Sequence, residues 1–383
     1  MSTQSTVNVL VGTRKGGFIF SSDQDRRKWT VSEVLFKGWN MMHMVIDPRN
    51  QRLYAALNHF VFGATIHYSD DMGKTWKQCP APPRFTRPSA SGRPGGTPEE
   101  SYSGGSIPQT PEQVLKVWNI EPGRANEPGV LYAGIQPASL FKSTDNGESW
   151  VLNEGLYDHP QRGQWNPGAG GLCLHSIVLD PSDPNRMYVA VSAAGVYRTD
   201  DGGQSWQPRN KNVLADFEAK TFPEFGQCVH KLALHPSQPQ VLYQQNHCGV
   251  YRSDNYGDDW IDLGEDKLPS RFGFPIVIHP HDPQTIYVML EESDQFRMSV
   301  DGQAAVWRSR NGGESWQRIT AGLPAQAHVV VLREAMVADN LSPAGLYAGT
   351  DTGQLFYSRD DGDNWEVLAD FLPPIQSVEI AMS

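Results

Sequence analysis

Cysteine is scarce in this sequence, and four residues among 383 cannot form the disulfide framework of a small secreted domain. Long apolar runs are also missing, and no stretch approaches the length of a transmembrane helix. Basic residues do not dominate: the net charge of −11 argues against a nucleic-acid groove or a surface for anionic membranes. The first six residues contain neither a basic start nor an apolar segment, so no secretion signal is visible. We expect a soluble, cytoplasmic protein.

One eight-residue pattern recurs along the whole sequence: Ser/Thr-x-Asp/Asn-x-Gly-x-x-Trp. Its hydroxyl and its carboxylate or amide can accept hydrogen bonds from backbone N–H groups of a tight turn, and Gly permits a positive φ. Each copy follows a β-type run, so the pattern predicts the hairpin turn of a repeated β unit, with Trp opening the next strand. This repeat is the Asp-box. Its clear copies occupy residues 69–76, 143–150, 199–206, 253–260, 309–316 and 358–365, and a degenerate copy ends at Trp29.

Four strands can be assigned around each Asp-box. In residues 174–209, an inner strand at 175–179 is followed by a turn, two further strands, the Asp-box and a fourth strand. Regular repetition of this order favours a β-propeller over a β-sandwich. Residues 7–11 align with second strands, and a spare strand at 377–381 ends the sequence. We therefore predict an all-β, seven-bladed β-propeller whose first blade is closed by the C-terminal strand, which removes an exposed sheet edge.

The predicted propeller is a single domain over residues 1–383. The Asp-box turns lie on one face, so the irregular loops, where binding sites are common, collect on the other face. The longest loop, 81–113, is predicted to be a lid or an arm that joins a neighbouring copy in a homo-oligomer. The predicted blades are 7–34 with 376–382, then 41–80, 114–153, 173–209, 228–263, 274–319 and 329–369.

Histidines collect at the start of two adjacent inner strands. Cys173-x-His175 and Cys228-x-His230 occupy equivalent positions, and His247 lies in a loop of the second of these blades. A spacing of two places each Cys and His on the same side of its strand. We predict that His175, His230 and His247 share one site at the channel mouth. They can bind a divalent metal such as zinc or another transition metal, or act as a general base. The alternative is that they hydrogen-bond backbone groups that line the channel. The two Cys are expected to be small buried hydrophobic residues.

Other side chains extend this candidate site. His43 and Glu334 are expected near its rim, and Arg333 reaches the same level from the last blade. Two carboxylates across a pocket suit glycoside hydrolysis, although a solvated surface carboxylate is the more ordinary interpretation. Aromatic rings on loops can stack on sugars, and packing of those loops is the equally ordinary alternative. The predicted catalytic residues are His175, His230, Arg333 and Glu334, and the predicted ligand-binding residues are His43, His59, Trp118, Trp165 and Arg271.

The sequence resembles the BNR/Asp-box superfamily. Within it, Val11-Gly-Thr-Arg-Lys-Gly-Gly17, Gly168-Ala-Gly-Gly-Leu-Cys-Leu-His175, Gln227-Cys-Val-His-Lys231 and Gln245-Asn-His-Cys-Gly-Val250 resemble bacterial seven-bladed proteins labelled sialidase-like or glycosyl hydrolase. The resemblance covers essentially the whole chain. Sialidases carry an Arg-Ile-Pro near the start and three Arg that bind the substrate carboxylate. This sequence has no Arg-Ile-Pro, so no sialidase catalytic residue is assigned here.

Three functions are consistent with these observations. The first is a hydrolase or lyase, with or without a metal, at the His-rich mouth of the channel. The second is a glycan-directed enzyme or lectin that uses the aromatic loops. The third is a non-catalytic scaffold that presents the irregular face to a protein partner. A small molecule or a carbohydrate is the expected ligand.

Overall fold

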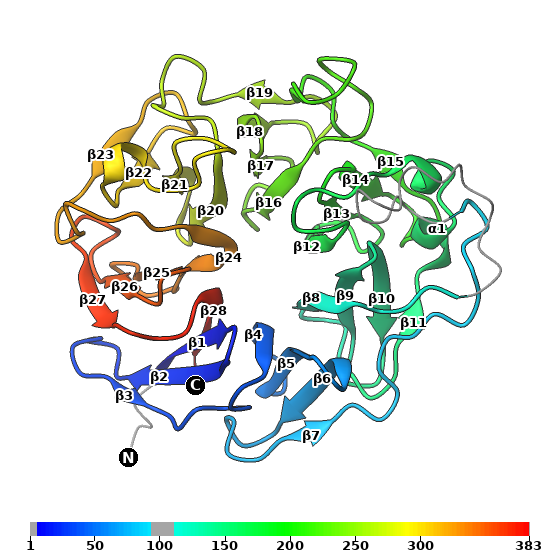
Figure 1. Cartoon of the computed structure of the whole chain (residues 1–383), viewed down its shortest axis with the longest axis horizontal. Coiled ribbons are helices and arrows are strands. Elements are labelled where there is room, and N and C mark those ends of the chain that lie inside the picture. The colour runs from blue at the N-terminus through cyan, green and yellow to red at the C-terminus, as the bar shows by residue number, and fades with distance from the viewer. Residues whose placement is uncertain (1–5, 93–110, 383) are drawn as a thin grey trace.

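A computed structural model, which describes residues 6–92 and 111–382, forms a ring of β-sheets around a central axis (Figure 1). Five sheets contain four antiparallel strands each. They are β4 (Asn40–Asp47), β5 (Arg52–His59), β6 (Gly63–Ser69) and β7 (Lys77–Gln78); β8 (Lys116–Pro122), β9 (Leu131–Gln136), β10 (Ser139–Ser143) and β11 (Val151–Leu152); β12 (Leu174–Leu179), β13 (Met187–Val191), β14 (Gly195–Thr199) and β15 (Gln207–Pro208); β16 (Val229–Leu234), β17 (Leu242–Asn246), β18 (Gly249–Ser253) and β19 (Ile261–Asp262); β20 (Gly273–His279), β21 (Asp282–Leu290), β22 (Val306–Ser309) and β23 (Gln317–Ile319).

The sixth sheet has eight strands in the order β27-β26-β25-β24-β28-β1-β2-β3. These strands are β24 (Val331–Ala338), β25 (Leu346–Thr350), β26 (Leu355–Ser358), β27 (Glu366–Ala369), β28 (Ile375–Met382), β1 (Val7–Thr13), β2 (Gly16–Ser22) and β3 (Thr30–Val31). Its two four-stranded halves meet at one parallel pairing, between Glu334 and Ser377. The short helices are α1 (Glu154–Tyr157), η1 (Arg162–Gln164) and η2 (Val300–Gly302). None of the helices in 6–92 and 111–382 has the length and apolarity needed to cross a membrane.

The two ends of the chain close the ring. β28 pairs antiparallel with β1, with Val11 opposite Val378 and Val7 opposite Met382. The predicted pairing of the C-terminal strand with the first strand is therefore confirmed. Because β28 lies nearest the axis in its half of the sheet, it replaces the inner strand that the N-terminal repeat lacks (Figure 1).

The Asp-box turn has the hydrogen bonds that its sequence predicts. In the second clear copy, the Ser143 hydroxyl accepts a bond from the backbone N–H of Gly147 at 2.9 Å. The Asp145 carboxylate accepts one from the N–H of Ser149 at 2.9 Å. Gly147 has φ +81°, a left-handed conformation that Gly adopts without steric cost. The Trp150 indole N–H then donates to the Gly147 carbonyl at 3.2 Å, so the motif stabilises its own turn.

The hydrophobic core lies between neighbouring sheets. Trp206 is 1 % exposed and packs with Ile177 of its own sheet and with Tyr132 and Leu140 of the preceding one. Trp150 is also buried. The prediction that these two Asp-box tryptophans fill the space between sheets is confirmed, and their burial explains why the repeat keeps a large apolar residue at this place.

The described ends of the long 81–113 segment pack on this chain. Phe85 stacks on Tyr157 of α1 with ring centroids 5.0 Å apart. Arg162 and Glu112 form a buried ion pair at 2.8 Å, which fixes the far end of the segment. The prediction that 81–113 forms a lid or an intermolecular arm stays a prediction, because residues 93–110 of this loop lie outside the described residues.

Candidate functional site

The innermost strands share a β-bulge near the channel mouth. In β4, β8, β12 and β16, the pairing with the next strand skips one residue, which is Met42, Trp118, His175 and His230 respectively. A bulge leaves one residue without a partner and can direct its side chain in a new direction. His175 and His230 are therefore structurally equivalent, as their Cys-x-His spacing predicted. His43 directly follows the bulged residue of β4, so it is one residue out of register with His175 and His230.

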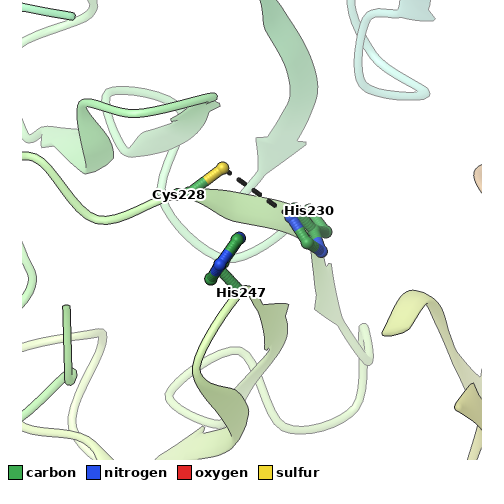
Figure 2. Close-up of side chains that lie close together, drawn as sticks. All are labelled: Cys228, His230 and His247. Atoms are coloured by element: carbon green, nitrogen blue, oxygen red, sulfur yellow. Dashed lines mark hydrogen bonds between the residues drawn. The ribbon is translucent and has the colours of Figure 1, made fainter. Parts of the chain in front are cut away.

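Cys228, His230 and His247 form one of two groups of potential metal ligands in the described residues (Figure 2). One ligand atom from each lies within 4.8 Å of the others. The Cys228 sulfur is 3.6 Å from Nε2 of His230, and the two imidazole centroids are 5.9 Å apart. Cys228 directly precedes β16, and His247 directly follows β17, so two adjacent strands of one sheet hold all three side chains.

The protonation of His230 follows from its hydrogen bonds. Its Nδ1 lies 2.6 Å from the carbonyl oxygen of Gly273, which can only accept, so Nδ1 carries the proton. Burial, and then the positive charge of Arg333, keeps the pKa of His230 well below its usual value. In the resulting neutral imidazole, Nε2 is an acceptor, and the Cys228 thiol donates to it at 3.6 Å. The pKa of His247 is also lowered by burial, against an opposing effect of Asp294, whose Oδ2 lies 3.6 Å from Nε2.

A pocket of about 320 Å³ opens over this group. Arg333 and Arg297 lie on its aromatic wall, with their guanidinium carbons 5.4 Å and 5.8 Å from the ring centroid of Phe274. A second pocket of about 330 Å³ shares Phe217, His247 and Asp294 with the first. Residues lining the first pocket include Asn166, Gly168, Gly170, Ser192, Phe217, Glu218, Cys228, His230, His247, Phe274, Asp294, Arg297 and Arg333. We call this first pocket the mouth pocket. It combines neutral imidazoles, a thiol, carboxylates and cations.

His175 does not join this group, and the prediction of a three-histidine site is wrong for this residue. Its side chain is fully buried, with Nε2 2.9 Å from the carbonyl of Val229 and Nδ1 3.1 Å from the hydroxyl of Ser176. Both ring nitrogens are thus engaged. Among the described residues, Cys228 takes the third place instead, although we expected a small buried hydrophobic residue there. Cys173 does match that expectation, because it is fully buried.

Glu334 and His43 belong to a second group, in which ligand atoms of His43, Glu334 and Glu379 lie within 4.8 Å of one another. His43 contacts Glu379 at 3.3 Å, and Glu334 forms an ion pair with Lys231. Nearby on β8, burial and then the charge of Glu379 raise the pKa of Glu121 to about 8. His43 and Glu334, which we expected at the rim of the histidine site, therefore belong to a separate network of acidic and basic groups.

The predicted aromatic platforms are occupied by protein contacts. Trp165 is fully buried and donates to the Tyr197 hydroxyl at 2.9 Å, so its assignment as a ligand-binding residue is wrong. Lys116 and Arg333 each lie 5.2 Å from the centroid of the Trp118 ring, and ligand binding by Trp118 stays a prediction.

Two further ligand-binding predictions have separate outcomes. His59 packs against Trp39, with centroids 4.5 Å apart, in an aromatic cluster of its own. Arg271 lines the second pocket and pairs with Asp262, and its role there stays a prediction.

Asp294 and Arg297 line the mouth pocket but were not identified from the sequence. Both come from an irregular loop without a repeated motif. The only available signal was the irregularity of that loop.

The family model for the BNR/Asp-box repeat matches residues 67–78 and 197–208, which contain two of the Asp-boxes described above. This match shows that the chain carries BNR/Asp-box repeats, and its ring of sheets is a β-propeller fold. The resemblance seen in the sequence and the predicted propeller class are confirmed.

The chain is also similar in sequence or in fold to several named proteins. The xyloglucanase Xgh74A of Acetivibrio thermocellus is 22 % identical over 273 residues, which covers 62 % of this chain and 30 % of that protein. The chain thus spans about a third of the length of the curated relatives it matches. An ancestral GH74 enzyme has a similar fold, with a TM-score of 0.57, 17 % identity, and coverage of 86 % of this chain and 38 % of that one. A structure of YCF48 bound to D1 peptide gives a TM-score of 0.50 at 12 % identity, with 93 % of each chain covered.

Proposed function

We propose that the protein is a hydrolase that binds a small carbohydrate or a related polar molecule in the mouth pocket. The observation that carries this proposal is the meeting of His230, His247, Asp294 and two arginines in one pocket of about 320 Å³. Such a volume suits a ligand of modest size. The names of the relatives support carbohydrate as the substrate class. Because this chain spans only about a third of their length, their specific activity is not transferred to it.

The chemistry of the pocket supports hydrolysis. A neutral imidazole at neutral pH can take a proton from water or from a substrate hydroxyl. His247 lies beside a carboxylate, with Oδ2 of Asp294 3.6 Å from its Nε2. Arg297 and Arg333 can bind an anionic substrate group or the negative charge that develops during hydrolysis. No residue outside the pocket is needed for these roles.

The test is a turnover screen of the full chain against aryl glycosides, xyloglucan oligosaccharides and aryl esters. For any substrate found, His247→Gln should lower kcat/KM by roughly 100-fold or more, the usual contribution of a general base. His281→Gln, an exposed histidine that contacts the Leu341 carbonyl, is the matched control and should retain activity. Absence of turnover across the screen, or full activity in His247→Gln, would contradict the proposal.

A scaffold function is the second candidate, and one observation favours it. The turn between β5 and β6 exposes Phe60, Val61 and Phe62 at 95 %, 64 % and 67 %. Three adjacent exposed apolar side chains suit contact with a protein partner. A scaffold predicts that Phe60→Ser with Phe62→Ser changes the proteins found by proximity labelling in cells, while His247→Gln does not. The reverse result would favour the hydrolase.

A further inference from the structure

We propose that Cys228, His230 and His247 bind one zinc-class transition-metal ion at the base of the mouth pocket. The inference uses the pocket of the proposed hydrolase and deepens that function, but it is tested independently of activity. Thiolate and imidazole are the ligands that zinc prefers in proteins, and three protein ligands with an open position are typical of catalytic zinc sites.

The spacing of the ligand atoms matches such an ion. With Zn–S near 2.3 Å and Zn–N near 2.0 Å, a tetrahedral ion holds sulfur and nitrogen roughly 3.6 Å apart. The sulfur of Cys228 and Nε2 of His230 are already 3.6 Å apart. His247 has a ligand atom within 4.8 Å of both, on a half-buried side chain that can move by a fraction of this distance.

The surroundings prepare His230 as a ligand. Histidine ligands commonly donate their second ring N–H to a carbonyl or carboxylate, which fixes the tautomer and the ring orientation. Nδ1 of His230 contacts the Gly273 carbonyl at 2.6 Å, so Nε2 is the nitrogen that faces the pocket. Asp294 lies 3.6 Å from His247 and can take the same role for that residue.

The second cluster shows why the metal is assigned to the mouth. His43, Glu334 and Glu379 also bring three ligand atoms within 4.8 Å, but the ammonium group of Lys231 pairs with Glu334 there. In that network, the Lys231 ammonium group already supplies the positive charge that a metal ion would bring. At the mouth, the two cations of the pocket, Arg297 and Arg333, lie against the Phe274 ring, and a thiol favours a softer metal.

The open side of the site connects the ion with the proposed reaction. The mouth pocket lies over the three ligands, so a fourth position faces the space in which a ligand would bind. A metal ion held there would supply Lewis-acid chemistry and make bound water more acidic, so this water would replace the imidazole of His247 as the base of the proposed hydrolase. Arg297 and Arg333 would then bind the substrate beside the metal.

The first test measures metal directly in protein purified without a His-tag or a chelator. We expect about one zinc-class ion per chain by mass spectrometry, and Co²⁺ substitution should give the sulfur-to-metal charge-transfer band of a thiolate ligand. Cys228→Ser should remove this band and weaken binding by more than the roughly 10- to 100-fold that loss of an outer-shell partner costs. Cys248→Ser, a buried thiol 3.2 Å from Asp216, is the matched control and should retain the band.

A second measurement on the unmodified chain covers the case in which Cys228→Ser fails to fold. Zn²⁺ should protect Cys228 from alkylation, while the three other cysteines serve as internal references. A wild-type protein without a charge-transfer band, a band that persists in Cys228→Ser, or alkylation of Cys228 unaffected by Zn²⁺ would overturn the metal proposal. Stoichiometric metal without turnover would contradict only the hydrolase, whereas turnover insensitive to chelator and to Cys228→Ser would contradict only the metal.

Discussion

Glu291 is a buried carboxyl group that should make the stability of the propeller depend on pH. It directly follows β21, is 2 % exposed, and neither of its carboxylate oxygens has a hydrogen-bond partner among the described residues. Burial raises its pKa to about 8, with Arg297 opposing this shift and Asp351 adding to it. Glu291 is therefore protonated in the folded protein at neutral pH, whereas it is ionised in the unfolded chain.

The sign and size of the effect follow from linkage. Between its ordinary pKa of 4.5 and about 8, the folded state binds more protons at Glu291 than the unfolded state does. Stability is therefore highest below the ordinary pKa and is lost as the pH rises toward 8. The free energy of unfolding falls by about 1.4 kcal/mol per pH unit in this interval, or by up to about 5 kcal/mol across it.

Glu291→Gln removes the titrating group but keeps the shape of the side chain. Relative to wild type, its free energy of unfolding should increase by about 1.4 kcal/mol per pH unit from pH 5 to pH 8 and stay constant below that range. Urea unfolding followed by tryptophan fluorescence at several pH values measures the difference. The neighbouring, exposed Glu292→Gln is the control and should give a difference that does not vary with pH. A pH-independent difference for Glu291→Gln would refute the reasoning.

Two further predictions concern the ring itself. Trp206→Ala should cost roughly 3–5 kcal/mol in urea unfolding, because it removes a large aromatic side chain from the core between two sheets; an unchanged midpoint would show that this residue contributes little. Deletion of the chain from residue 377 onward should expose the edge of β1 and cause aggregation in light-scattering measurements; a monomeric, stable truncation would show that β28 is not needed for closure.

The fold could be predicted because the residues that form each Asp-box turn all lie within one short repeat. The hydroxyl, the carboxylate and the glycine of an Asp-box bind one another within eight residues, as Ser143, Asp145 and Gly147 show. The closure by β28 followed from counting strands at the two ends. Neither inference required knowledge of contacts between distant side chains, which a single sequence does not provide.

The site was predicted only in part, because it depends on ring orientation. His175 and His230 have the same Cys-x-His spacing and the same bulge, and each bonds to a carbonyl of the next inner strand. His175 uses Nε2 for this bond, whereas His230 uses Nδ1, and only the second choice turns Nε2 toward the preceding cysteine. Periodicity places both residues correctly but cannot choose between these two rotations.

The repeated bulge explains where chemistry can arise in this propeller. Each of four inner strands offers one re-aimed side chain at the mouth, and apolar or aromatic residues, Met42 and Trp118, fill two of these positions. His175 fills the third, but its bonds to Ser176 and Val229 occupy both nitrogens. Both histidines have a cysteine two residues earlier, but the residue after the second strand is Ser192 beside His175 and His247 beside His230. The potential metal ligands therefore meet only in the second of these two blades, where His247 and the ring orientation of His230 complete the group.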